Sequence, residues 1–240
     1  MRKLLLLILL LTLLFDGLYA QRRNGIIGRR RESSGLFVFS FGPDYCYGDP
    51  DDSRPFLGPV FNQNLLKNLD FSLGYRQTYG STFNQIPSTY GFKASINYGD
   101  VTGADIKNLT RGYSFNSRLI QFKIQAEYAL YFGGGRYSRF KPNSVYGFLG
   151  TGIMQTESNL TNSTGYGNSK YLYKKSDLAP IIPYGVGFMH DFDNNFSLGA
   201  ELNFEFTFSD YIDGFKPPYP ESKSNDVLNG FSIVLSYKLF

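Results

Sequence analysis

Two acidic residues, Glu201 and Glu205, stand in the most regular stretch of the sequence, residues 195–209. Apolar residues occupy every second position there, and both glutamates fall on the positions between them. In a strand, this period places the apolar side chains on one face and the two carboxylates on the other. A buried carboxylate is tolerated when it is paired with a cation and hydrogen-bonded. The chemistry expected of Glu201 and Glu205 is therefore ion pairing with basic residues of other strands.

Charged residues occur at matching inward positions in four other alternating stretches. Together with Glu201 and Glu205, they give four cations and four carboxylates, namely Arg76, Lys93, Lys123 and Lys238 with Asp70, Glu127, Glu201 and Glu205. An eight-stranded barrel is just filled by its own side chains, so balanced charges on its inner face should pair and fill it. A proton or solute path along the same face remains an alternative. The predicted interior ion-pair network consists of Arg76, Lys93, Lys123, Glu127, Glu201 and Glu205.

Constellations typical of enzymes or metal sites are scarce in this sequence. The single histidine, His190, and the single cysteine, Cys46, lie in separate regions, so we expect no metal site. No serine adjoins His190 in sequence, and a serine–histidine pair formed through space stays open as a membrane-embedded hydrolase alternative. The glycine run at 133–135 lacks the lysine of a phosphate-binding loop and is typical of a turn. We expect no enzymatic activity, no cofactor and no small-molecule substrate.

Period-two alternation recurs along the whole chain and predicts eight strands. The first, third, fifth and seventh connections are expected to be long and the others short. This arrangement is typical of an outer-membrane barrel, with short periplasmic turns and long extracellular loops. The predicted fold is therefore all-β, an eight-stranded antiparallel transmembrane barrel. The predicted strands cover residues 36–41, 69–77, 88–99, 118–132, 144–155, 179–191, 195–209 and 229–240.

The N-terminal residues 1–20 have the pattern of a secretory signal peptide. Arg2 and Lys3 precede an apolar run that ends before a plausible cleavage site at Ala20. The run is shorter than the roughly 20 residues of a transmembrane helix, so we expect export. Residues 21–35 then form an arginine-rich periplasmic segment before the barrel at 36–240, either a solvated tail or a tether to an acidic partner. The arginines of this predicted partner-binding segment are Arg22, Arg23, Arg29, Arg30 and Arg31.

The composition fits a membrane barrel and argues against one class of partner. The chain has 19 Tyr and 23 Phe, which can supply the aromatic belts at both membrane interfaces. A net charge of +4 is too small to suggest a nucleic-acid-binding protein. The expected location is the cell outer membrane, crossed several times by the chain and surrounded by lipid.

Four short motifs lie at distinctive places relative to the predicted strands. Tyr-Gly-Asp at 47–49 follows the first strand, and Arg-Gly-Tyr-Ser-Phe at 111–115 precedes the fourth. Phe-Ser-Asp-Tyr-Ile-Asp-Gly at 208–214 follows the seventh, and Ser-Tyr-Lys-Leu-Phe at 236–240 ends the chain. On these motifs, residues 36–240 resemble the PorG-like family of small outer-membrane barrels of Bacteroidota, which is associated with the type IX secretion system.

The resemblance implies a role in protein secretion and gliding motility. A member of that family would anchor the periplasmic ring of the secretion machinery, so the expected partners are periplasmic secretion-ring proteins. The arginine-rich segment is not part of the family pattern. Besides the hydrolase, a second alternative stays open, namely a general surface or adhesion barrel that acts through its extracellular loops.

The C-terminal strand is predicted to carry the signal for assembly into the outer membrane. Its apolar row ends at Leu239, and the aromatic Phe240 closes the chain. Deleting Leu239 and Phe240 should abolish insertion, because the deletion shortens the apolar face that must enter the membrane. Heat-modifiable gel mobility of the membrane fraction measures the folded barrel, and normal amounts after the deletion would contradict the prediction.

Overall fold

The computed structural model describes residues 33–47, 68–83, 86–104, 113–133, 142–162, 176–192, 195–214 and 225–239. All regular structure within these ranges is β-strand. None of the described residues belongs to a helix long and apolar enough to cross a membrane. The predicted signal peptide and the five arginines of the segment that follows it lie outside the described residues.

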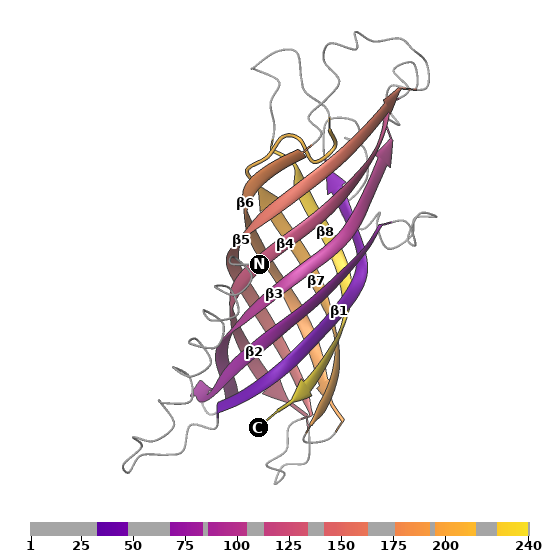
Figure 1. The fold of residues 1–240 in the computed structure, drawn as a ribbon. Coiled ribbons are helices and arrows are strands. Elements are labelled where there is room, and N and C mark those ends of the chain that lie inside the picture. Colours follow the sequence, from indigo (N-terminus) through magenta and orange to yellow (C-terminus); the bar gives the residue numbers. More distant parts are fainter. Residues whose placement is uncertain are drawn as a thin grey trace, which may run out of the picture. The chain divides into compact units, whose positions relative to one another are not determined.

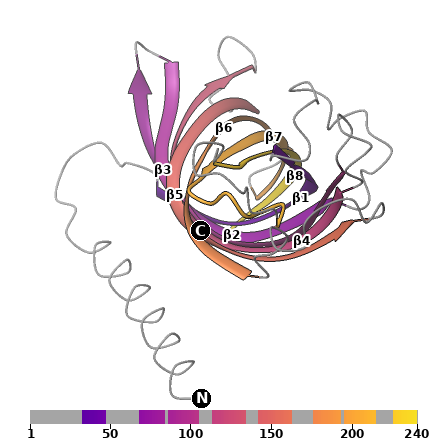
Figure 2. The same cartoon turned by 90° about the horizontal axis from the view of Figure 1, so that it is seen from above.

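The strands form one closed antiparallel barrel in which each strand pairs with its neighbours in sequence and β1 pairs with β8. Figure 1 shows the tilted strands, and Figure 2 shows the ring that they form, seen from above. A closed ring has no open sheet edge, which is the condition for a sheet in lipid. The predicted fold is confirmed. The strands are β1 (Ser33–Tyr47), β2 (Leu69–Phe83), β3 (Ile86–Ala104), β4 (Tyr113–Phe132), β5 (Asn143–Asn162), β6 (Ser176–Asp191), β7 (Phe196–Thr207) and β8 (Val227–Lys238).

Strand β4 shows how the sequence pattern produces two different faces. Ile120, Phe122 and Ile124 point outward and are between 43 and 47% exposed, whereas Gln121 and Lys123 are at most 6% exposed. Burying apolar surface away from water is the main driving force of folding, so an apolar outer face is unfavourable in water. The same face is favourable in hydrocarbon, and alternation of this kind is typical of membrane barrels.

Exposed large apolar side chains occur on all eight strands and form a belt around the barrel. Aromatic residues are frequent in this belt, and some of them pair across strands, such as Phe132 with Phe188 at 6.2 Å between ring centroids. A belt of this kind marks the surface that faces lipid in an outer-membrane barrel. Members of the belt on successive strands are Phe39, Leu73, Ile96, Ile124, Leu149, Val186, Leu198 and Ile233.

The first six strands are longer than the apolar periodicity predicts, and β3, β4 and β5 are the longest of them. β3, β4 and β5 contain 19, 20 and 20 residues, about twice the 9–11 that cross a bilayer at a tilt. Beyond the belt their outward residues become polar, as Ser114, Asn116 and Arg118 show in β4. The connections expected at 100–117 and 156–178 are correspondingly shorter, because strand residues occupy parts of both ranges. Apolar alternation does not reveal these strand segments, because their outward side chains are polar.

Strand β5 carries aromatic side chains on its inner face. Tyr146 and Phe148 are buried in the barrel, while Val145 and Leu149 face outward. Phe148 lies opposite Gly185 of β6, where an added Cβ would stand 2.5 Å from the Phe148 ring. The missing side chain therefore makes room for an inward aromatic ring. Apolar residues on both faces also explain why this stretch alternates only weakly in the sequence.

Two neighbouring substitutions in β7 should have very different effects. Phe204 faces outward and stacks on Tyr184 at 5.5 Å, whereas Asn203 faces inward and donates a hydrogen bond to Ser232 Oγ at 2.8 Å. Phe204→Arg places a charge against lipid and should cost about 2–4 kcal/mol. Asn203→Ser loses one hydrogen bond and should cost about 1 kcal/mol. Heat-modifiable gel mobility compares the two variants, and equal losses of folded barrel would contradict the assigned faces.

Candidate functional site

The half of the barrel interior nearer the start of β1 and the end of β8, called here the terminal half, holds a compact charge cluster. Arg76 Nε lies 2.6 Å from Glu127 Oε2, and Arg76 Nη2 lies 3.3 Å from Glu201 Oε1. Lys93 Nζ is 3.0 Å from the same Glu201 oxygen, to which Tyr146 also donates its hydroxyl proton at 2.7 Å. The four charged side chains are between 3 and 7% exposed. Glu201 is therefore the acceptor that joins both cations.

Aromatic rings from β5 complete this cluster. The Arg76 guanidinium carbon lies 5.0 Å from the centre of the Tyr146 ring, and Lys93 Nζ lies 5.2 Å from the centre of the Phe148 ring. Both distances are within the range in which a ring face attracts a cation. The inward rings thus fill space in the barrel and contribute to holding the two cations.

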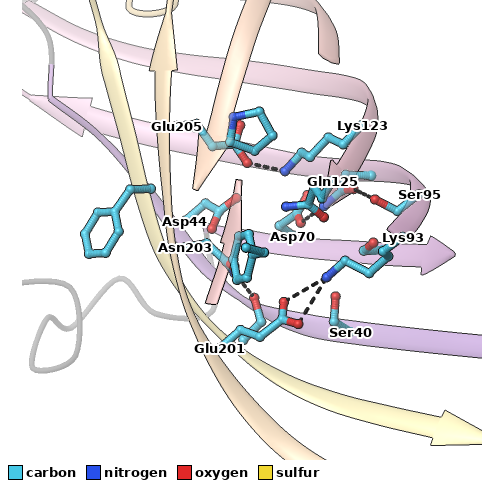
Figure 3. Close-up of a pocket in the computed structure, with 16 residues that line it drawn as sticks. Ser40, Asp44, Asp70, Lys93, Ser95, Lys123, Gln125, Glu201, Asn203 and Glu205 are labelled. Atoms are coloured by element: carbon cyan, nitrogen blue, oxygen red, sulfur yellow. Dashed lines mark hydrogen bonds and ion pairs between the residues drawn. The ribbon is translucent and has the colours of Figure 1, made fainter. Parts of the chain in front are cut away.

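The other half of the interior, called here the mouth half, contains a second and separate set of polar contacts. Lys123 forms an ion pair with Glu205, and Gln121 Nε2 donates to Glu205 Oε2 at 2.7 Å. Asn97 Nδ2 donates to Asp70 Oδ2 at 2.8 Å. Figure 3 shows Lys123 reaching toward Glu205, with Asp70 labelled beside them. The Asn97–Asp70 bond joins the neighbouring strands β3 and β2, whereas the contacts of Glu205 link β7 with β4 across the barrel.

The coil that follows β7, residues 208–214, lies inside the ring of strands at the mouth (Figure 2). Ile212 is completely buried, and its carbonyl oxygen accepts a hydrogen bond from Ser158 Oγ at 2.9 Å. The same carbonyl accepts a bond from Ser117 Oγ, and Ile212 N donates to Asp226 Oδ2 at 2.8 Å. These bonds fix the coil to β4, to β5 and to the residue that precedes β8. This coil is also one of the four motifs that carry the family resemblance.

Ile212 inserts into an apolar cluster that fills the mouth. Above the charged groups, the barrel is thus closed by side chains from several strands and from the coil. An eight-stranded barrel leaves room for its own side chains and little else. In the described interior, side chains occupy the space of the barrel apart from a small polar cavity. The cluster consists of Cys46, Val101, Phe115, Leu119, Met154, Ile181, Ile212 and Leu228.

All six residues proposed from the sequence for the interior network are buried, and each forms at least one ion pair with another member. They form two groups. Lys123 and Glu205 pair in the mouth half, and the remaining four cluster in the terminal half. The five arginines of residues 21–35 lie outside the described residues, so they are not part of this geometry.

The two residues that could have suggested other chemistry lie apart. His190 Nδ1 is 2.8 Å from Asn143 Oδ1, and the His190 ring meets the Phe192 ring edge-on at 4.9 Å. Cys46 is buried in the apolar cluster at the mouth. Within the described ranges, no group of three or more His, Cys, Asp or Glu side chains is arranged to hold a metal ion.

Several interior residues were not found by reasoning from the sequence. Asp44 belongs to β1, which continues past the predicted end at 41, and its signal was the apolar Pro43 and Tyr45 at odd-numbered positions. Tyr146 had no clear signal, because both faces of β5 carry apolar residues. Ile212 had none, because a coil that returns into a barrel has no periodicity.

Residues 53–230 match the model of a protein family described as "Domain of unknown function (DUF6089)". The match covers more than half of the chain. The chain belongs to this family. Membership in this family does not indicate an activity, because the family description names none. No curated protein matches the sequence.

Three solved structures similar to this chain come from bacteria. The attachment invasion locus protein Ail of Yersinia pestis, in complex with the heparin analogue sucrose octasulfate, is 14% identical, with 87% of this chain and 99% of that chain covered and a TM-score of 0.44. Neisserial surface protein A is 12% identical, with coverage of 87% and 99% and a TM-score of 0.39. A major outer membrane protein from Thermus thermophilus is 12% identical, with coverage of 85% and 99% and a TM-score of 0.42. At such identities and TM-scores, the likenesses say nothing about what the DUF6089 chain binds or does.

Removing the shared acceptor of the terminal half should destabilise the barrel far more than removing an exposed carboxylate. Glu201→Gln leaves Arg76 and Lys93 undercompensated in the interior and should cost about 3–5 kcal/mol. The matched control is Asp100→Asn, since Asp100 pairs with Arg118 at 3.5 Å on the exposed surface and should contribute at most about 1 kcal/mol. Guanidinium unfolding in detergent micelles, followed by tyrosine fluorescence, gives both values.

A double variant separates the contribution of charge from the contribution of packing. Lys93→Met with Glu201→Leu replaces one buried pair by apolar side chains of similar size, which is often neutral or stabilising for buried pairs. The double variant should therefore recover much of the stability lost in Glu201→Gln. A double variant less stable than the single one would show that packing around Tyr146 matters more than charge.

Proposed function

We propose that this protein is a non-enzymatic outer-membrane barrel that anchors a periplasmic assembly of the type IX secretion and gliding machinery. The observation that carries the proposal is the filled interior. Charged pairs that are 3 to 7% exposed and an apolar cluster at the mouth leave no channel through the described residues. A barrel without a conducting path must act through its ends, its lipid-facing surface or its attachment to the membrane.

The terminal end provides a projecting hairpin for a periplasmic partner. Pairing between β2 and β3 continues to Phe83 opposite Ile86, whereas pairing between β1 and β2 stops at Ser33 opposite Tyr79. The hairpin therefore extends past its neighbour, and Figure 2 shows it leaving the ring of strands. Tyr79 and Tyr90 stack on it, with ring centroids 5.6 Å apart. Aromatic residues are enriched at protein contact surfaces.

The sequence also favours the terminal end as the end that contacts a partner. The arginine-rich residues 21–35 directly precede and enter β1, which begins at the terminal end, and termini of outer-membrane barrels lie in the periplasm. The resemblance of four motifs to those of the PorG-like family supports a secretion role. A hydrolase receives little support, because the His190 ring nitrogen that has a described partner faces Asn143 rather than a serine.

A surface or adhesion function is the second candidate, and one observation favours it. β3, β4 and β5 continue beyond the apolar belt with a polar outer face, so structured sheet stands above the membrane at the mouth end. Extended strands of this kind can present loops to ligands outside the cell. The two candidates differ in which end of the barrel a partner contacts, and this difference can be tested directly.

Replacing Arg29, Arg30 and Arg31 with Ser should weaken retention of periplasmic partners and leave the barrel folded. Arginine pairs bidentately with carboxylates, and exposed pairs of this kind are screened by salt over about 8 Å at physiological ionic strength. Partners are co-purified from solubilised membranes across a salt series. The recovery of periplasmic partners should fall at a lower salt concentration for the variant than for the natural chain. Mass spectrometry identifies the recovered proteins.

The matched control is Arg118→Ser, which removes an exposed arginine at the opposite end of the barrel. It should leave the recovery of periplasmic partners unchanged. If both variants retain the same partners with the same salt dependence, residues 21–35 are a plain tail. If recovery instead depends on Arg118, the partner contacts the mouth end, and the surface function is the better interpretation.

A further inference from the structure

The two halves of the barrel interior differ in their charge balance. In the terminal half, two cations face two carboxylates and all four are paired. In the mouth half, the buried carboxylates of Asp44, Asp70 and Glu205 line one cavity with Lys123, and the Lys93–Glu201 pair of the terminal half borders the same cavity. Lys123 is engaged by Glu205, which leaves the charges of Asp44 and Asp70 without a paired cation among the described residues. A buried charge is costly unless it is compensated, so this excess requires a counter-charge.

Asp44 is the clearer of the two groups. Its side chain has no hydrogen-bond or ion-pair partner within the described ranges, although only 7% of the residue is exposed. It lines an internal polar cavity together with Asp70, Ser40 and Ser72. The cavity has a volume of about 20 Å³, enough to hold a water molecule. Figure 3 shows Asp44 beside this cavity with Asp70 and Glu205. An unpaired carboxylate thus points into a space where a small ligand fits.

The backbone makes room for both carboxylates. Asp44 stands opposite Gly230 of β8, and Asp70 stands opposite Gly99 of β3. A Cβ on Gly99 would lie 2.8 Å from Asp70 Oδ1, and one on Gly230 would collide with Asp44 Oδ1. Each carboxylate therefore rests against a glycine. A side chain at either glycine would displace the acid from its position at the cavity.

We propose that the mouth half of the interior binds one hard divalent cation, with Ca²⁺ the best match, between Asp44 and Asp70. A charge of 2+ balances the excess of the two carboxylates. Ca²⁺ takes six to eight oxygen ligands, drawn from carboxylates, neutral protein oxygens and water. The two carboxylates, the hydroxyl groups of Ser40 and Ser72 and cavity water are oxygen donors of this kind. No imidazole or thiol is among the described residues that line the cavity, so the donor set disfavours softer transition metals.

The first experiment measures calcium in the folded barrel. The mature chain is refolded in detergent with EDTA, supplied with Ca²⁺ and passed through a desalting column. Mass spectrometry for calcium should then find one ion per barrel, and the midpoint of thermal unfolding should rise with added Ca²⁺, because a ligand of the folded state stabilises it. Barrel without bound calcium and with an unchanged midpoint would overturn the proposal and show that protons neutralise the two acids.

Variants then assign the site. Asp44→Asn and Asp70→Asn should each lower Ca²⁺ affinity by more than about tenfold, since even outer-shell partners of metal ligands cost that much. Asp100→Asn, which removes an exposed carboxylate, is the matched control and should bind like the natural chain. Equal calcium binding in all variants would place the ion elsewhere and overturn the assignment. If an interior variant does not fold, the calcium content and unfolding midpoint of the natural chain still decide the question.

Discussion

The need to compensate charge inside a closed eight-stranded barrel governs the rest of this structure. The interior is just wide enough for side chains, so each inward Lys, Arg or Glu must find its partner among the other strands. Arg76, Lys93 and Glu201 come from three strands and meet at one point. A slip of one residue in any of these strands would turn its charges toward lipid and its apolar side chains inward. The ion pairs and the apolar belt therefore specify the same register from opposite faces.

Packing of neutral groups completes what the charges begin. β5 contributes rings to the interior, and the glycines of β6 leave the space that those rings occupy, as Phe148 and Gly185 show. At the mouth, the 208–214 coil contributes Ile212 to the apolar cluster formed by side chains of several strands. Its backbone groups are satisfied by Ser158 and Asp226, so the coil is held by hydrogen bonds as well as by apolar contact. The interior is thus closed at the mouth by a segment that belongs to no strand.

The fold and most of the charged interior could be predicted from the sequence, because both depend on period-two alternation. Glu201 and Glu205 were placed by the apolar residues around them, and the basic residues of β2, β3 and β4 by the same rule. Two features could not be predicted in this way, because apolarity stops being a guide to direction: strand ends beyond the membrane have polar outer faces, and inward aromatic residues obscure the period in β5. Asp44 was missed for another reason. The first strand was expected to end at 41, although Pro43 and Tyr45 continue its alternation.

A polar interior has a physical advantage that goes beyond filling space. Apolar residues could fill the barrel equally well, and replacing buried ion pairs by them is often neutral or stabilising. Strands apolar on both faces would, however, expose long hydrophobic segments before insertion, and such segments aggregate. Paired charges keep one face of each strand polar until the barrel closes. That argument requires charges that balance, as they do around Glu201. It does not account for two acids without paired cations, Asp44 and Asp70, at the other end of the same interior, where a bound cation would restore the balance.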